Sequence, residues 1–406
     1  MTFFRVAGFR SLGASVFLNS VGMMGEVVVL GWLTLELTNS PLLVGVAMGM
    51  RSLPMFFVGV PAGALADRLP RHRLLMATGA GQAVTAATLG ILTLAGAVGL
   101  GHVLLLTLAA GALRGAEHAA RQSYTHDVVG AAALVKGFAV LGVAMRAGWL
   151  LGSLVAGAII ARAGSGAAYL AVAAGYLAGA AALVRASTST RAASPPPAGS
   201  LWRSVVEFLA AVRTDRALLV LIALTAGAEI FGFAHQVLLP SLARDVLRIG
   251  PEGLGVLNAA RSVGGILGLV AATARGAPPG GGALFLLVIA VFGAGLVGLG
   301  VAPSLVGLWG VVVVLTIANG AGALADLLAQ SLLQLSVPRS LRGRAGGAWV
   351  VAIGLAPLGQ LQIGALASLF GVSAALAASG LALAALAVAA AVLFPPVRRL
   401  GATDRG

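Results

Sequence analysis

A short charged stretch, Gly63-Ala-Leu-Ala-Asp67-Arg68-Leu-Pro-Arg71-His-Arg73, separates two long apolar runs of the chain. The run before it extends from about Ser40 to Ala66, and the run after it from Leu74 to Leu100. Because about 20 apolar residues cross a bilayer as a helix, this stretch is predicted to be a tight loop at a membrane surface. Gly63 would let the two helices approach closely, and the arginines favour the cytoplasmic side.

The composition of the whole chain excludes an ordinary soluble domain. Apolar residues make up 59% of the 406 residues and charged residues only 9%, against about 25% charged residues in globular proteins. The absence of cysteine excludes disulfides and thiolate metal sites. The net charge of +14 is spread over short loops between apolar runs and forms no continuous patch. We therefore expect a membrane protein without nucleic acid, metal or cofactor.

Twelve apolar segments are long enough to cross a bilayer as helices. They cover residues 10–37, 40–66, 74–98, 102–122, 133–161, 166–186, 217–239, 252–272, 282–301, 304–332, 346–370 and 372–394. The predicted fold class is therefore an all-α membrane protein with twelve transmembrane helices. If the N-terminus lies inside, most of the 26 basic residues also lie inside, which predicts that both termini are cytoplasmic.

A polar connection at residues 187–216 divides the chain into two six-helix halves. The predicted bundles cover 1–186 and 217–394, and a tail follows at 395–406. Ser194-Pro-Pro-Pro197 cannot be helical and is typical of a linker. The apolar residues after it fall on one helical stripe, which predicts a short amphipathic helix on the inner leaflet. The alternative is a helical extension that packs on its own domain.

The two halves repeat each other. Gly45-Val46-x-x-x-x-Arg51-Ser52 recurs as Gly255-Val256-x-x-x-x-Arg261-Ser262, and Gln122-Ser123 recurs as Gln330-Ser331 at nearly the same offset. Two independent matches in corresponding spans favour two bundles that are related by a pseudo-two-fold axis along the membrane normal.

The opening stretch resembles the signature of the major facilitator superfamily between its second and third helices, Gly-x-x-x-Asp-Arg-x-Gly-Arg-Arg. Here Pro70 replaces the second glycine and His72 lies within the basic pair. Other stretches resemble the branch of enterobactin exporters and macrolide efflux proteins. They are Phe9-Arg10-Ser-Leu, Leu37-Thr38-Asn-Ser40-Pro41-Leu-Leu-Val-Gly45, Leu239-Pro240-x-Leu-Ala-Arg244-Asp245, Val337-Pro338-Arg-Ser-Leu-Arg342-Gly343-Arg344 and, in the fifth span, the exporter-like Gly152-Ser153-Leu-Val-Ala156-Gly157.

This resemblance implies a function. It implies a monomeric secondary transporter of the inner cell membrane that exports a small organic molecule, such as a drug, siderophore or secondary metabolite, by proton antiport. It also implies that Asp67 meets the start of the eleventh span and stabilises the outward-facing state, while Arg68, Arg71 or Arg73 pairs with an acid near the end of the fourth span.

Two other functions stay open. One is import or uniport of a polar metabolite, and the other is a membrane scaffold or sensor that transports nothing. An enzyme is not expected, because the sequence shows no paired Ser/His/Asp or His-rich constellation. ATP drive is not expected either, because no phosphate-binding Gly-x-x-x-x-Gly-Lys-Ser/Thr motif is present.

The predicted spans contain four acids and four arginines, although a charge at a helix centre costs at least about 2.5–3.5 kcal/mol. They are Glu26, Glu117, Glu229, Asp326, Arg51, Arg114, Arg146 and Arg261. The four acids fall on the first, fourth, seventh and tenth spans, which line the central cavity in the resembled architecture. Spacings of three and four residues put Asn19 on the helix face of Glu26, and Gln236 on that of Glu229.

We expect Glu26, Glu229 and Asp326 to exchange a proton or to contact a cationic substrate. Because burial favours the neutral acid and a nearby arginine favours the carboxylate, a conformational change that alters either one can release a proton. The alternative is a permanent ion pair that fixes helix packing, and this is the role we expect for Glu117.

The arginines and one histidine have two interpretations each. Arg51 and Arg261 occupy equivalent positions in the two halves and, with Arg146, could contact an anionic substrate or the acids. The alternative is that they are paired packing residues. His235 could be a proton group or, as is more common, a hydrogen-bonded wall residue. Pro357 predicts a bend in the eleventh span.

Overall fold

The computed structural model describes residues 7–68, 70–130, 134–184, 216–275, 281–305, 307–335, 352 and 354–400. These ranges are almost entirely helical and contain no β-strand, which confirms the predicted all-α class. The predicted linker helix, the last six residues and the expected start of the eleventh span near Gly346 lie outside the described residues.

The chain forms two compact units. Unit 1 comprises Met1–Pro196 and Arg248–Ala259, and unit 2 comprises Pro197–Leu247 and Ala260–Gly406. We describe each unit by itself.

Unit 1 is built mainly from five long helices. They are α1 (Ala7–Thr38), α2 (Pro41–Arg68), α3 (Arg71–Leu94), α4 (Leu100–Val129) and α5 (Leu134–Ala181). The long α5 contains a break at Gly164, where φ is 80° and ψ is 171°. A positive φ is readily adopted only by glycine, so Gly164 joins two helices that correspond to the predicted fifth and sixth spans.

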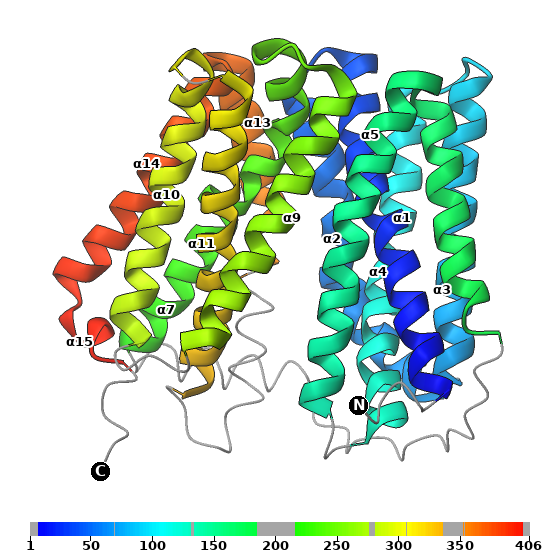
Figure 1. Ribbon diagram of the computed structural model, residues 1–406, viewed down its shortest axis with the longest axis horizontal. Helices are drawn as coiled ribbons and strands as arrows, with labels where there is room; N and C mark the ends of the chain where they lie inside the picture. Colours follow the sequence, from blue (N-terminus) through cyan, green and yellow to red (C-terminus); the bar gives the residue numbers. More distant parts are fainter. Residues whose placement is uncertain are drawn as a thin grey trace. The chain divides into compact units, whose positions relative to one another are not determined.

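The closest helix packing in unit 1 is between α1 and α5, which run side by side (Figure 1). A Cβ on Gly148 would lie 2.5 Å from the carbonyl oxygen of Phe17, and one on Gly152 would lie 2.3 Å from that of Val21. Such distances are sterically forbidden, so these glycines are what lets the two backbones touch.

Unit 2 begins with a helix of irregular hydrogen bonding. Its segments are α7 (Arg216–Gly227), the π-helix η3 (Ala228–Gly232), the 3₁₀-helix η4 (Phe233–Leu238), α8 (Leu239–Ser241) and the π-helix η5 (Leu242–Val246). The prediction of one regular helix at 217–239 is therefore wrong in two respects: the helical segment continues to Val246, and it is not a regular α-helix. Gly227 and Gly232 lower the helix propensity, and Pro240 has no N–H to donate, which together favour the altered turns.

The other described helices of unit 2 follow in order. They are α9 (Gly250–Arg275), which unit 1 shares, α10 (Gly281–Leu305), α11 (Gly307–Leu335), α13 (Ala356–Phe370), α14 (Val372–Leu393) and α15 (Pro395–Arg398). In α13, Pro357 stands in the first turn, where its missing N–H has no partner to lose. In the described part of the chain, Pro357 therefore marks the beginning of a helix and not the predicted bend within one.

Membrane-spanning character is widespread in both units. Eight helical stretches of the described chain are long and apolar enough to cross a membrane, and one of them, Gly137–Ala181, holds the break at Gly164. Many large apolar side chains stand on the surface, including Leu105 with 67% of its area exposed and Val143 with 71%. A surface of this kind is stable against lipid and not against water.

Candidate functional site

The acid of α1 lies in a cluster of buried charges in unit 1. Arg114 Nη2 lies 2.7 Å from Glu26 Oε2, and Arg51 Nε lies 3.8 Å from Glu26 Oε1. The Tyr176 hydroxyl also donates a short hydrogen bond to Oε2, and it accepts one from Arg114 Nη2 at 3.2 Å. Glu26 is only 5% exposed, so this pairing compensates much of the cost of burying its charge.

The cluster holds more hydrogen-bond donors than acceptors. Two guanidinium groups face one carboxylate, which leaves an excess positive charge. Within the described residues, Arg51 Nε and Nη2, Arg114 Nε and the hydroxyl of Tyr169 are buried without a hydrogen-bond partner. An anionic group or a water molecule would complete this arrangement.

The sequence interpretation missed the two tyrosines. The chain has only three tyrosines, and two of them, Tyr169 and Tyr176, stand seven residues apart in the second half of α5. Seven residues are two helical turns, which puts both side chains on one helix face. The spacing of these two tyrosines could therefore have predicted a polar face on this helix.

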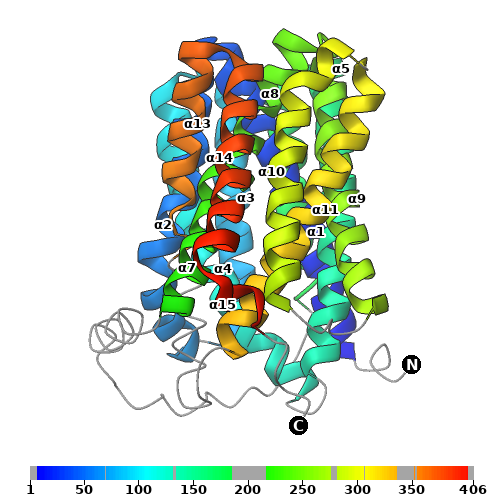
Figure 2. The ribbon, with the colours of Figure 1, turned by 90° about the vertical axis from the view of Figure 1, so that its left-hand side faces the viewer.

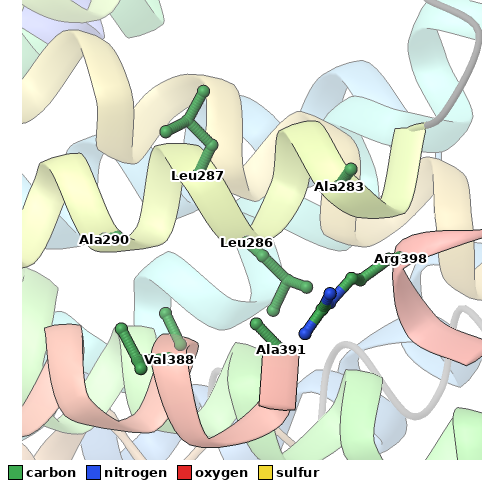
Figure 3. Close-up of a pocket in the computed structure, with 8 residues that line it drawn as sticks. Ala283, Leu286, Leu287, Ala290, Val388, Ala391 and Arg398 are labelled. Carbon is green, nitrogen blue, oxygen red and sulfur yellow. The ribbon is translucent and has the colours of Figure 1, made fainter. Parts of the chain in front are cut away.

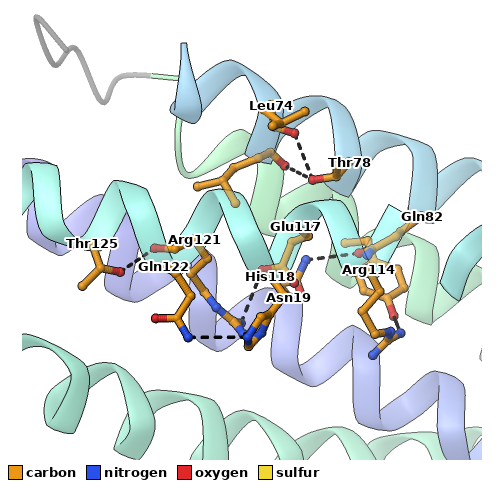
Figure 4. A network of polar contacts seen from close by, with 12 residues as sticks. Asn19, Leu74, Thr78, Gln82, Arg114, Glu117, His118, Arg121, Gln122 and Thr125 are labelled. Carbon is orange, nitrogen blue, oxygen red and sulfur yellow. Dashed lines mark hydrogen bonds and ion pairs between the residues drawn. The ribbon is translucent and has the colours of Figure 1, made fainter. Parts of the chain in front are cut away.

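Other polar residues of unit 1 form separate contacts, seen in Figure 4. Glu117 pairs with Arg121 one turn later at 3.3 Å, in keeping with the structural role expected for it. His118 contacts Arg121 at 3.3 Å, and Asn19 Nδ2 donates to Gln82 Oε1 at 3.4 Å. Asn19 therefore tethers α1 to α3 on the helix face that it shares with Glu26.

The charged loop makes one of its expected contacts. Arg71 Nη1 lies 2.5 Å from Asp127 Oδ1 near the end of α4 and also donates to the carbonyl of Ser123 at 3.4 Å. Arg73 is exposed. The side chains of Asp67 and Arg68, like residue 63, lie outside the described side chains, so the contact of Asp67 with the eleventh span stays a prediction.

The remaining predicted residues of unit 1 lie on α5. Arg146 lies over the ring of Trp149, 5.7 Å from its centroid, which is cation–π geometry. Gly152 contacts the backbone of α1, and Gly157 lies against Gly255 in the part of α9 that belongs to the same unit. Both signature glycines thus stand at close helix contacts.

In unit 2, Glu229 and Asp326 line one small cavity. Its other walls include Thr225, Phe233 and Phe285, and its volume of about 10 Å³ suits about one water molecule. Among the described residues no hydrogen bond or ion pair is recorded for Glu229, while Asp326 accepts a hydrogen bond from Gln330 at 3.5 Å. Two carboxyl groups that face one such cavity favour sharing a proton over carrying two charges.

The backbone at this acid is irregular. Glu229 lies inside the π-helix Ala228–Gly232, between the regular helix α7 and the 3₁₀-helix η4. Single π turns within helices occur often at functional sites, because they re-aim side chains and loosen the hydrogen-bond ladder. Glu229 is therefore placed in an irregular turn of the kind that often carries a functional residue.

An arginine of α9, Arg261, donates hydrogen bonds to two side-chain amides. Arg261 Nη2 donates to Gln236 Oε1 at 3.0 Å, and its Nε donates to Asn319 Oδ1 at 3.4 Å. Asn319 in turn contacts His235 Nε2 at 3.4 Å, while His235 Nδ1 contacts the carbonyl of Gly232 at 2.7 Å. Because both ring nitrogens of this fully buried histidine have a partner, the geometry supports the interpretation of His235 as a wall residue.

Comparisons with known proteins agree with this architecture. The family of transmembrane secretion effectors matches residues 1–405. The enterobactin exporter EntS of Shigella boydii serotype 4 (strain Sb227) is 26% identical over 372 residues, which are 87% of this chain and 85% of that protein.

Solved transporter structures resemble the fold at low sequence identity. The nucleoside transporter NupG has a TM-score of 0.79 and 13% identity over 95% of this chain and 99% of its own. The peptide transporter POT in complex with sulfate has a TM-score of 0.79 and 15% identity over 97% of this chain and 95% of its own. We conclude that the chain is a multi-pass membrane transporter and belongs to the transmembrane secretion effector family of the major facilitator superfamily.

Proposed function

We propose that this transporter expels a small organic molecule and is driven by protons that move in the opposite direction, by alternating access. The observation that carries the proposal is the pair of carboxyl groups, Glu229 and Asp326, that line one small cavity beside a π-helical turn in unit 2. The similarity to a protein named as an exporter supports the direction.

The acid pair has the properties of a proton carrier. Repulsion from Asp326 and the partly apolar walls both favour a neutral Glu229, and access to water would favour its carboxylate. A transporter that exposes the cavity to one side of the membrane and then to the other would take up a proton on the acidic side and release it on the opposite side. The irregular helix at Glu229 supplies the local freedom for that change.

Glu26 has a different role in this proposal. Arg114, Arg51 and Tyr176 all stabilise its carboxylate, so protonation would leave two adjacent guanidinium groups without a counter-charge. We therefore assign Glu26 to the ion pair that organises unit 1, and we assign the proton to Glu229 with Asp326.

The substrate is proposed to meet unit 1 through the unsatisfied donors beside Glu26. Arg51 supplies two buried nitrogens that make no hydrogen bond in the described chain, and Tyr169 supplies a hydroxyl. Donors in excess of acceptors favour a substrate with an anionic or strongly accepting group. Drugs, siderophores and secondary metabolites that carry such a group are the candidate cargo.

The proposed setting is the inner cell membrane, with a monomeric chain and both termini in the cytoplasm. The distribution of basic residues along the sequence supports this orientation. Asp67 of the charged loop is proposed to stabilise the outward-facing state, and the ion pair of Arg71 with Asp127 shows that this loop is anchored to α4.

The function is tested by flux. A screen of dyes, antibiotics and siderophores in a host that lacks its own efflux pumps first identifies a transported compound. The purified protein is then placed in proteoliposomes, and efflux of that compound is measured under an imposed pH gradient. Glu229→Gln and Asp326→Asn are expected to reduce gradient-driven efflux at least about tenfold, because neither amide can carry a proton.

Glu252→Gln is the matched control for this test. Glu252 is an exposed acid at the start of α9, and its neutralisation is expected to leave the gradient dependence intact. Unchanged coupling in both Glu229→Gln and Asp326→Asn would show that the acid pair does not carry the proton. Efflux that ignores the pH gradient in the unmodified protein would point to uniport, and a protein that moves no compound would point to a scaffold or sensor.

A further inference from the structure

Unit 2 contains a largely apolar groove that none of the candidate site residues described above lines. It lies between α10 and α14, is closed at one end by α15, and has a volume of about 260 Å³ (Figure 3). The groove follows from the sequence. Close to their middle, α10 and α14 touch through glycine, since a Cβ on Gly293 would lie 2.6 Å from the carbonyl oxygen of Gly380.

Towards α15 the contact between these two helices is made of small side chains that leave space. Ala283, Ala290, Ala387 and Ala391 line the groove, together with the exposed Leu287. Alanine is too short to fill the distance between two helices at this position, so the groove stays open along its side. Figure 2 shows α10, α14 and α15 at this face of unit 2.

The surface around the groove consists of exposed aliphatic side chains. Leu287 is 59% exposed, Val388 57%, Val392 62% and Leu393 69%. Exposed aliphatic side chains of this size on two long apolar helices face acyl chains in a membrane protein. The groove is therefore open to the bilayer along its length.

A positively charged residue, Arg398, lines the closed end of the groove. The side chain of Arg398 reaches from α15 toward Leu286 and Ala391, as Figure 3 shows. Within the described residues no carboxylate is recorded as a partner of Arg398, and Arg399 beside it is exposed as well. The end of the groove is thus basic, while its walls are apolar.

The backbone holds Arg398 in this place. Pro395 and Pro396 follow directly on the end of α14, and the Gly282 N–H donates to the carbonyl of Leu400 at 3.0 Å. A Cβ on Gly282 would lie 1.8 Å from the carbonyl oxygen of Val397, so only glycine allows α15 to lie against α10. The basic end of the groove is consequently a built feature and not a loose tail.

We propose that this groove binds an anionic phospholipid of the surrounding bilayer, with one acyl chain between α10 and α14 and the phosphate on Arg398. A guanidinium forms charge-assisted hydrogen bonds with phosphate oxygens, and basic pockets between transmembrane helices recognise anionic headgroups. The acyl chain would cover apolar side chains that are otherwise exposed. A second copy of the chain fits less well, because a symmetric contact would bring two Arg398 side chains together.

The test uses the full-length protein in detergent with two lipids that share the same acyl chains. Dioleoyl-phosphatidylglycerol is anionic and dioleoyl-phosphatidylcholine is zwitterionic. Native mass spectrometry counts the retained lipid, and thermal unfolding measures the stabilisation. The unmodified protein is expected to retain phosphatidylglycerol about tenfold more tightly than phosphatidylcholine, and Arg398→Gln is expected to abolish that preference.

Two further variants make the result specific. Arg399→Gln removes a neighbouring charge that does not line the groove and is expected to keep the preference, and Arg398→Lys is expected to keep most of it. Ala290→Phe fills the groove and is expected to reduce retention of both lipids. An unchanged preference in Arg398→Gln, a dimer in the mass spectrum, or a lipid-free monomer at saturating phosphatidylglycerol would overturn the proposal. None of these readouts depends on transport.

Discussion

The first helices of the two halves both carry a glutamate, but the two acids have opposite surroundings. In unit 1, α1 is one uninterrupted helix, and Glu26 lies among Arg114, Arg51 and Tyr176. In unit 2, the segment from Arg216 to Val246 alternates between α, π and 3₁₀ turns, and Glu229 shares a small cavity with Asp326. A repeated sequence plan has therefore produced one fixed ion pair and one acid pair that favours a shared proton.

The difference follows from the partners that each half supplies. Unit 1 places arginines on α2 and α4 within reach of its acid. In unit 2 the equivalent arginine, Arg261, contacts the amides of Gln236 and Asn319. In unit 1, glycines of α5 also let the backbones of α1 and α5 come into direct contact. The two halves thus differ in the surroundings of their acids: Glu26 is paired with arginines in unit 1, whereas Glu229 shares a cavity with a second carboxyl group in unit 2.

The largest expected effect concerns the ion pair of unit 1. Arg114→Met leaves the buried Glu26 carboxylate with Arg51 at 3.8 Å as its remaining cation, which should lower the free energy of unfolding by about 3–5 kcal/mol. Chemical or thermal unfolding of the purified protein in detergent measures this loss. The double variant Glu26→Gln/Arg114→Met should lose clearly less. A loss below about 1 kcal/mol in the single variant would mean that Glu26 is not held as an ion pair.

A smaller effect is expected from the packing of α1 on α5. In Gly152→Ala the new Cβ meets the Val21 carbonyl oxygen at 2.3 Å, which should cost about 1–3 kcal/mol because the helices must separate. Gly142, on the same helix, has nothing within 4 Å of its Cβ position, so Gly142→Ala should be neutral or up to about 1 kcal/mol more stable. Equal unfolding midpoints for the two variants would refute the close contact.

The smallest effect is expected at the acid of unit 2. Glu229→Gln should change the free energy of unfolding by no more than about 1 kcal/mol, because the described residues supply no ion pair for it to lose and the amide removes repulsion from Asp326. The same unfolding measurement compares it directly with Glu26→Gln, which should be more destabilising. If Glu229→Gln costs as much as Arg114→Met, the contrast between the two halves is wrong.

The class of fold could be predicted from the sequence because the bilayer imposes a simple rule. A helix must be apolar over about 20 residues to span it, so the apolar runs around the Asp67 loop and along the rest of the chain mark the helices directly. Boundaries were good where glycine or proline ends a run, as between the predicted fifth and sixth spans at Gly164. They failed from Glu229 to Val246, because a helical sequence pattern does not distinguish α from π or 3₁₀ hydrogen bonding.

Composition and spacing also selected most of the charged residues of the candidate site, because a buried charge needs a reason wherever it stands. What the sequence could not determine was which charge meets which. Glu26 of α1 pairs with Arg114 of α4, and Tyr176 of α5 donates a hydrogen bond to the same carboxylate, so the three partners come from positions far apart in the chain. Such partners are chosen by how helices pack, and packing depends on distances between side chains that are remote in sequence. The apolar runs of the sequence thus determined that the chain folds into long apolar helices, while the tertiary structure alone decided that Glu26 pairs with Arg114 and that Glu229 lines a small cavity together with Asp326.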